Sequence, residues 1–136
     1  MTSQEGRVRQ LRLVVHAEDY EEALRFYRDV IGMPVQEAYA GDGGAQVSIL
    51  EAGRATLELS NTAQVEMIDA VEVGRRVAPH LRVALEVDDA QAATTTAVAA
   101  GAELIAPPTE TPWRSLNSRL EGPAGVQLTL FQELDG

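Results

Sequence analysis

The stretch LRLVVHAEDYEEALRFYRDVIG, residues 11 to 32, contains in order an apolar strand pattern, an acidic turn and an amphipathic helix pattern that ends at a glycine. Residues 81 to 101, LRVALEVDDAQAATTTAVAAG, repeat this order, and Leu81 follows Leu11 by 70 residues. An internal repeat of this kind indicates that two halves of a chain share one structural plan. The sequence therefore predicts two related modules, each containing a strand followed by a helix.

The length and composition favour one domain built from both modules. With 136 residues, 45% of them hydrophobic, the chain can bury one good core, whereas each half alone would be marginal. We expect a single domain over residues 1–136, with an N-terminal module over 8–60, a linker with a short helix over 61–79 and a C-terminal module over 80–134. Each module has the predicted order βαβββ, so the fold class is α+β with eight strands.

The predicted elements follow from periodicity and from helix capping signals. Asp19 and Asp89 are good N-cap residues for helices that end near Gly32 and Ala100, and a short helix is expected around 65–73. The segment PPTETPW at 107–113 is predicted to be a loop. Strands are predicted at 8–16, 35–40, 45–52, 55–60, 80–87, 102–105, 116–121 and 126–134. One face of the first helix collects the apolar residues Tyr20, Ala23, Leu24, Tyr27, Val30 and Ile31.

The charge balance limits the classes of partner. Twenty-one acidic residues against eleven basic ones give a net charge of −10, which argues against nucleic acid and against anionic membrane surfaces as partners. No apolar run approaches the roughly 20 residues of a membrane span, and the polar start lacks a signal-peptide core, so we expect a cytoplasmic protein. The absence of cysteine excludes disulfides and thiolate metal sites.

Alternation along the strands separates an apolar face, expected under the helices, from a more polar one. On the first strand the polar face carries Arg12 and His16, and on the strand at 80–87 it carries His80 and Arg82. Four positions that are equivalent under the repeat lie on this face: Arg12, Glu58, Arg82 and Thr129.

Several motifs together resemble one known family. The segments DYEEALRFYRDVIGM, LEL, RVALEVDD and GPAGVQLTLF are similar to those of the vicinal oxygen chelate superfamily, which includes glyoxalase I, bleomycin-resistance proteins and extradiol dioxygenases. The resemblance implies that the two modules form a cup-shaped, curled, eight-stranded mixed sheet with helices on its outer face, and that the protein is a homodimer. In the metalloenzymes of that family a divalent cation is held by four positions, which correspond here to Arg12, Glu58, Arg82 and Thr129.

These four residues are a poor set of metal ligands. Only Glu58 has a suitable side chain, because a guanidinium stays protonated and carries donors only. We therefore predict no metal and no cofactor, and an ion cluster of Glu58 with Arg12 and Arg82 in the metal's place. The three charges either neutralise one another structurally, or they anchor an acidic group of a ligand with their formal charge of +1. In either case we expect Glu58 to contact at least one arginine and Glu58→Gln to destabilise the protein.

Further residues are candidates for a ligand site. His16 and His80 are expected on the cup face, as a general acid or base or as ordinary solvent-facing histidines. Trp113, the only tryptophan, is either a stacking lid over a ligand or a plug over the sheet edge. Tyr39, Phe131 and Arg119 are candidates for the pocket wall.

The function that the sequence favours is a metal-free protein that binds a small organic ligand in the cup. The alternative is a glyoxalase-like lyase or isomerase that acts on a small oxygenated substrate, with Glu58, His16 or His80 as its base. A third possibility is an assembly or regulatory module without a small ligand, in which the space between the modules would be filled.

Overall fold

The computed structural model describes residues 6–134, and the order of its elements follows the repeat. The first module comprises β1 (Val8–His16), α1 (Tyr20–Leu24) continued by the π-helix η1 (Arg25–Ile31), β2 (Val35–Ala40), the 3-10 turn η2 (Asp42–Gly44), β3 (Gln46–Ala52) and β4 (Ala55–Ser60). The connecting helix is α2 (Thr62–Glu72). The second module comprises β5 (Leu81–Val87), α3 (Ala90–Ala99), β6 (Glu103–Glu110), β7 (Ser115–Gly122), the 3-10 turn η3 (Pro123–Gly125) and β8 (Val126–Glu133).

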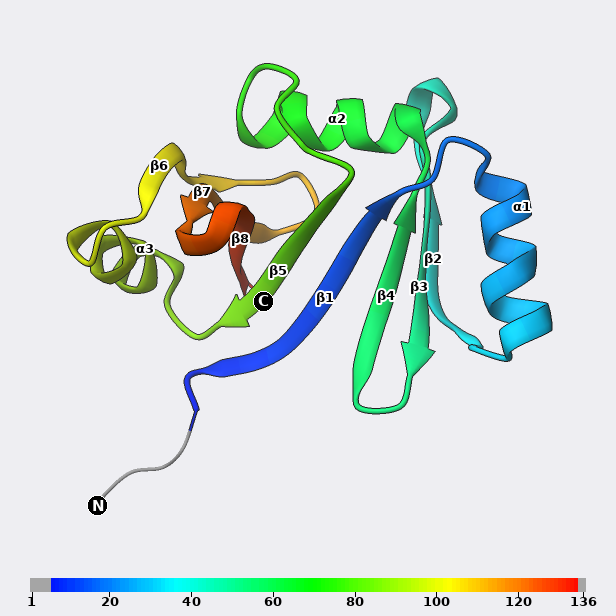
Figure 1. The fold of residues 1–136 in the computed structure, drawn as a ribbon. Coiled ribbons are helices and arrows are strands. Elements are labelled where there is room, and N and C mark those ends of the chain that lie inside the picture. Colours follow the sequence, from blue (N-terminus) through cyan, green and yellow to red (C-terminus); the bar gives the residue numbers. More distant parts are fainter. Residues whose placement is uncertain (1–5, 135–136) are drawn as a thin grey trace.

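All eight strands form one mixed, open sheet in the order β2-β3-β4-β1-β5-β8-β7-β6 (Figure 1). β1 runs parallel to β4, β5 runs parallel to β8, and the modules meet where β1 and β5 run antiparallel. Exchanging the modules leaves this order unchanged, so an approximate twofold axis passes between β1 and β5. The predicted α+β fold with an eight-stranded mixed sheet is confirmed.

The register places the equivalent polar positions around the centre of the sheet. Val14 of β1 lies opposite both Glu58 of β4 and Arg82 of β5. Ala84 of β5 lies opposite both Arg12 of β1 and Thr129 of β8. Since side chains directly opposite one another point to the same face, all four polar residues share the concave side of the sheet.

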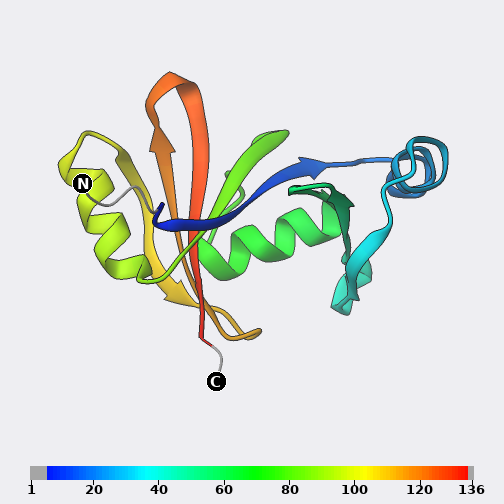
Figure 2. The same cartoon turned by 90° about the horizontal axis from the view of Figure 1, so that it is seen from below.

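Helices α1 and α3 cover the outer face at its two ends, as expected (Figure 2). Under α1, Tyr20, Leu50 and Leu59 form a buried apolar cluster. Burial of each leucine side chain contributes about 1.5–3 kcal/mol relative to its exposure. A buried hydrogen bond joins helix to sheet in each module, between Tyr20 and Ser48 and between Thr94 and Ser118. The side-chain caps predicted at Asp19 and Asp89 are confirmed.

The end of the first helix differs from its predicted face. Residues Arg25–Ile31 are wound as a π-helix, which has more residues per turn than an α-helix and so rotates the last turn relative to the first. Val30 and Ile31 are consequently 68% and 57% exposed instead of facing the sheet. The prediction that they share the buried face of Tyr20 and Tyr27 is wrong, and the outer surface gains two apolar side chains.

The connecting helix lies on the opposite side of the sheet from α1 and α3. In Figure 2, α2 lies between the two arms of the curved sheet, inside the cup. It begins at Thr62, three residues before the predicted start, because Asn61 caps it: Asn61 Oδ1 accepts hydrogen bonds from the backbone N–H groups of Gln64 at 2.8 Å and Gln46 at 3.1 Å. The linker therefore forms a wall inside the cup.

Strand β6 is longer than predicted and passes through Pro107 and Pro108, which the sequence places in a loop. β6 is an edge strand, and its pairing with β7 shifts register between Ala106 and Thr109. A proline is tolerated at such an edge or irregularity because no ladder hydrogen bond is lost there. Among residues 6–134, no helix is long and apolar enough to cross a membrane.

Candidate functional site

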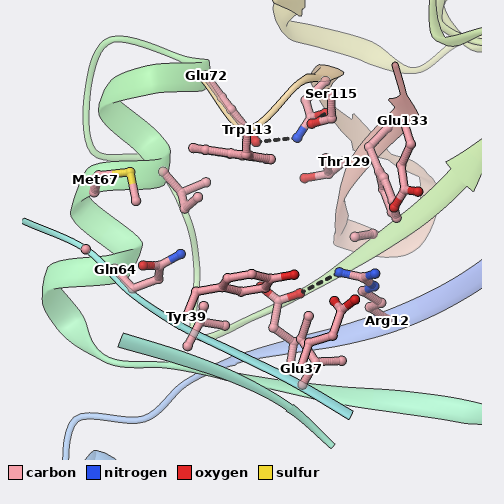
Figure 3. Close-up of a pocket in the computed structure, with 18 of the residues that line it drawn as sticks. Arg12, Glu37, Tyr39, Gln64, Met67, Glu72, Trp113, Ser115, Thr129 and Glu133 are labelled. Atoms are coloured by element: carbon pink, nitrogen blue, oxygen red, sulfur yellow. Dashed lines mark hydrogen bonds and ion pairs between the residues drawn. The ribbon is translucent and has the colours of Figure 1, made fainter. Parts of the chain in front are cut away.

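A cavity of about 790 Å³ lies between the concave face of the sheet and α2. Figure 3 shows Gln64 and Met67 approaching it from α2, Arg12 and Tyr39 from the first module, and Trp113 from the second. Apolar side chains make up much of the wall, including Val47, Ile49, Met67, Ile68, Ala84, Trp113, Phe131 and Leu134. Polar side chains are at least as numerous and come from every wall: Arg12, Glu37, Tyr39, Glu58, Gln64, Glu72, Arg82, Arg114, Ser115, Asn117, Thr129 and Glu133.

The four equivalent positions all line this cavity, and each arginine has its partner within its own module. Arg12 Nη1 lies 3.8 Å from Glu58 Oε1, and the two side chains are 16% and 15% exposed. Arg82 Nη1 donates a hydrogen bond of 2.6 Å to Thr129 Oγ1. The predicted contact between Glu58 and an arginine is thus confirmed for Arg12, at a distance beyond that of a hydrogen bond.

At Glu58 the effect of burial on the pKa outweighs that of the two arginines. Burial raises the pKa of the Glu58 carboxyl, although the nearby Arg82 and Arg12 act in the opposite direction. Burial likewise lowers the pKa of the Arg82 guanidinium, and the positive charge of Arg119 adds to this effect. The two arginines therefore stabilise the charged form of Glu58 by less than burial destabilises it.

From these observations we predict the opposite of the stability effect that the sequence suggests for Glu58→Gln, which is itself untested. A carboxyl whose folded pKa is above its unfolded value of about 4.3 destabilises the fold progressively as the pH rises from there through the folded pKa. We expect Glu58→Gln to match the wild type near pH 4 and to be equally or more stable at pH 7 to 8. Urea unfolding at both pH values measures this, with Glu103→Gln on the exposed side of β6 as the control. A variant less stable than wild type at pH 7 would restore the original expectation.

The residues at these positions do not fit a divalent metal ion. The donor set has one carboxylate and one hydroxyl, and the two guanidinium cations would repel the metal. No group of three or more His, Asp or Glu side chains in residues 6–134 is arranged to hold a metal ion. The donor set therefore disagrees with the metal centre that the superfamily's metalloenzymes carry at these positions.

Arg119 does not line the cavity, in contrast to its predicted place in the ligand site. Its side chain is completely buried, with Nη1 at 2.8 Å from Asp69 Oδ1 and Nη2 at 2.7 Å from Glu72 Oε1. Nη1 also donates to Gln127 Oε1 at 3.0 Å. Asp69 and Glu72 belong to α2, so Arg119 fixes that helix against β7 under the cavity wall.

Asp69 is the centre of this polar network. Its Oδ2 accepts hydrogen bonds from the backbone N–H groups of Val77 and Ala78 at 2.8 and 2.9 Å, and Arg76 lies 3.4 Å away. Burial alone would raise the pKa of Asp69, but these backbone hydrogen bonds, with that from Arg119, lower it overall. The network ties residues 76–78, which follow α2, back to that helix.

The two histidines are also separate from the cavity. His16 Nε2 is hydrogen bonded to Thr62 Oγ1 at 2.7 Å, and the backbone N–H of His16 donates to the carbonyl of His80 at 3.0 Å. Both residues border a different groove, beside α1. A small hollow between the sheet and α2 is nevertheless bordered by His16, His80 and Arg82, so the histidines share the concave side with that arginine. Their role as a general acid or base remains a prediction.

The aromatic candidates do lie at the cavity. The Arg12 guanidinium lies over the Phe131 ring, 5.3 Å from its centroid, which is a cation–π arrangement. Trp113 is 45% exposed and Tyr39 is also exposed, at opposite sides of the opening. Their roles in ligand binding, and those of Glu58, Arg82 and Thr129, remain predictions.

Several of the cavity residues that sequence reasoning missed come from α2, and others, among them Glu37, Ser115 and Asn117, come from the sheet. Gln64, Met67, Ile68 and Glu72 line the cavity, although their segment reads as a linker. The available signal was local: Asn61 is a strong N-cap, and Asp69 and Glu72 form an acidic pair three residues apart, hence on one helical face. Their arginine partner lies 47 to 50 residues further along the chain, so the pairing could not be deduced from the linker alone.

Comparisons with known proteins agree on the fold. The family model of the Glyoxalase/Bleomycin resistance protein/Dioxygenase superfamily matches residues 9–130. Similar solved structures include a hypothetical protein from Bacillus halodurans, with a TM-score of 0.68 and 14% identity over 92% of this chain and 94% of that one. Methylmalonyl-CoA epimerase from Mycobacterium tuberculosis has a TM-score of 0.65 and 18% identity over 99% of this chain and 94% of the epimerase.

A member of the same superfamily from Vibrio splendidus has a TM-score of 0.59 and 13% identity, over 91% of this chain and 98% of that one. At these identities, the structural likeness establishes the fold alone. No curated protein matches the sequence.

Proposed function

The chain belongs to the Glyoxalase/Bleomycin resistance protein/Dioxygenase superfamily, and on this premise we propose that it binds a small organic molecule in the cavity between α2 and the sheet, without a metal centre. The resemblance that the sequence motifs indicate is thereby confirmed. Superfamily membership and neighbours such as methylmalonyl-CoA epimerase support a small-molecule-binding role in general terms. That the ligand binds in this cavity, and that it does so without a metal centre, are the specific parts of our proposal.

The observation that carries the proposal is the cavity itself. A volume of about 790 Å³ falls within the range of roughly 300–1,000 Å³ typical of small-molecule sites. Its wall combines apolar and aromatic side chains, which suit the body of an organic ligand, with polar groups that can fix its orientation. A filled core between the modules would have favoured an assembly role; the open cavity favours a ligand.

The binding proposal is tested with Nile red, an uncharged apolar probe whose fluorescence rises when it leaves water. We expect saturable binding that also changes the emission of Trp113, the only tryptophan. Ala84→Leu places a larger side chain on the cavity floor and should weaken binding, because it takes up space that the probe would occupy. The same substitution at the exposed Ala99 of α3 should leave binding unchanged. Absence of saturable binding, or equal binding by both variants, would contradict a ligand site in this cavity.

Native mass spectrometry of the freshly purified protein tests the metal-free part of the proposal. We expect no zinc, nickel, manganese or iron at one per chain, because the donor set contains a single carboxylate between two cations. Glu58→Ala provides the control. A metal present at one per chain in the wild type and lost from Glu58→Ala would show that the four positions hold a metal after all.

We also propose that the protein is a cytoplasmic homodimer. Exposed apolar side chains lie along the outer face, at Leu11 and Leu81 of the central strands and at Phe26, Val30 and Ile31 beside α1. Exposed apolar surface can mark interaction sites in soluble proteins, and a dimer would bury these side chains. Sedimentation at micromolar concentration is expected to give twice the 14.6 kDa of one chain. A species of 14.6 kDa alone would exclude the dimer.

A lyase or isomerase is the second candidate, and one observation favours it. The Glu58 carboxyl lies in the cavity with a raised pKa, which suits a group that takes up and releases a proton. If the wild type converts a ligand recovered from it while Glu58→Gln binds the ligand without converting it, the second candidate holds. A recovered ligand that stays unchanged in contact with the wild type supports a binding protein.

A further inference from the structure

Two guanidinium groups on the cavity floor keep donors available for a ligand. Arg12 Nε donates to Gln10 Oε1 at 3.2 Å, and Arg82 Nη1 donates to Thr129 Oγ1. In residues 6–134, the one fully buried side-chain nitrogen or oxygen that lacks a hydrogen-bond partner is Arg119 Nε. No other side-chain hydrogen bond joins Arg12 or Arg82 to the described residues. Because their remaining N–H groups are not among the buried groups without a partner, they are accessible.

The charges around these donors are not balanced. Arg12 and Arg82 carry +2 and Glu58 carries −1, so this group has a net charge of +1. The other carboxylate deep in the cavity, Glu72, has its charge offset by Arg119, whose Nη2 donates to Oε1 at 2.7 Å, and its Oε2 accepts a hydrogen bond from Asn117 at 2.6 Å. Its charge still acts on Arg82, where it opposes the effect of burial on the pKa.

The network around Asp69 is neutral by itself. Arg119 and Arg76 carry +2, and Asp69 and Glu72 carry −2. The single positive charge that remains on the cavity floor is therefore that of Arg12, Arg82 and Glu58, and one negatively charged group would neutralise it.

The rest of the cavity wall indicates which kind of molecule would carry this negatively charged group. Phe131 lies directly beneath Arg12, and Ile49, Met67 and Trp113 continue the apolar surface toward the opening. Glu37 and Glu133 also line the cavity and belong to exposed residues, where solvent and salt reduce their effect. Glu37 still acts on the floor, since its charge helps to raise the pKa of the Glu58 carboxyl.

We propose that the ligand is an organic monoacid whose carboxylate is bound by Arg12 and Arg82 beside Glu58, with its apolar body against Phe131, Met67 and Trp113. Guanidinium groups suit this role because their planar N–H donors match the two oxygens of a carboxylate. The inference rests on the proposed function, since it specifies the ligand class of the same cavity. It differs from metal-centred binding, because the arginines themselves supply the positive charge for the ligand oxygens.

The test compares three molecules of nearly equal shape: 4-phenylbutyrate, 4-phenylbutyramide and 4-phenylbutylamine. Titration calorimetry, with Trp113 emission as a second measure, gives the affinity of each. We expect the acid to bind at least about tenfold more tightly than the amide, and the amine to bind most weakly. Arg12→Met and Arg82→Met should each remove about tenfold from the affinity for the acid and leave that for the amide nearly unchanged. Arg28→Met, at an exposed pair on the outer helix, should change neither.

A second variant keeps the test decisive if the arginine variants fail to fold. Glu58→Gln removes the carboxylate that competes for Arg12 and should raise the affinity for the acid, with little effect on the amide. Equal affinity for acid and amide, or preference for the amine, would overturn the monoacid inference while leaving a small-molecule site in place. If none of the three molecules binds and Nile red does not bind either, the proposed function fails together with the inference.

Discussion

Arg119→Met is expected to lower the free energy of unfolding by about 3–5 kcal/mol, the cost of leaving buried charges without their partner. Asp69 and Glu72 would both lose a hydrogen bond of 2.8 Å or less, at positions nearly closed to solvent. Urea unfolding of wild type and variant measures the difference. The control is Arg114→Met, which breaks an exposed pair with Glu110 and should cost about 1 kcal/mol or less.

The interpretation can be checked by removing the carboxylates as well. In an Asp69→Asn, Glu72→Gln background, no buried charge is left unpaired by Arg119→Met, so its additional cost should be much smaller. If Arg119→Met lowers stability by no more than Arg114→Met, the network does not hold α2 in place. The cavity wall would then need another explanation.

The same network adds an acid-dependent contribution to stability. The pKa of Asp69 is lowered in the folded state, so its contribution is complete above the unfolded value of about 3.9 and is lost as the pH falls below that value through the folded pKa. The difference in stability between wild type and Asp69→Asn should accordingly shrink below about pH 4.

Leu59→Ala is expected to cost about 2–5 kcal/mol, because it leaves a cavity in a core that cannot fully collapse around it. Leu59 is completely buried and packs with Tyr20 and Leu50 between α1 and the sheet. Leu104→Ala on the edge strand β6, where the leucine is 44% exposed, is the matched control and should change stability by about 0.5 kcal/mol or less. Thermal or urea unfolding of both variants gives the comparison.

Equal effects of the two leucine substitutions would mean that α1 does not pack on β4 as described. The position matters for the site as well, because Leu59 and Glu58 are neighbours on opposite faces of β4. A loosened Leu59 would therefore disturb the strand that presents Glu58 to the cavity.

The sequence predicted those parts of the fold that depend on local pattern. Alternation located β1, β4, β5 and β8, the caps Asp19 and Asp89 fixed where two helices begin, and the repeat brought Arg12 and Arg82 into equivalent places. The contact of Glu58 with Arg12 could be predicted from the alternation and the repeat, because the strands β4 and β1 that carry the two residues are neighbours in the sheet.

The parts that were not predicted depend on contacts between distant segments. Nothing in residues 61–79 shows that this segment folds back into the cup, because its buried partner, Arg119, is on the seventh strand. Arg119 has the same place in the strand alternation as a pocket residue, and only the helix packed over it removes it from the cavity. The exposure of Val30 and Ile31 has a similar origin, since the change from α- to π-helical winding is not visible in an apolar pattern of α-helical spacing.

The approximate twofold axis between β1 and β5 relates two strands with the same residue type at their centre, Arg12 and Arg82, but the last strands of the modules differ. One module offers the acid of Glu58 and the other the hydroxyl of Thr129. An elongated molecule laid across the axis can be turned end for end on a nearly symmetric frame, yet the two orientations meet different groups and differ in energy. The site therefore favours one end-to-end orientation of such a molecule, although the strands that frame it are related by the approximate axis.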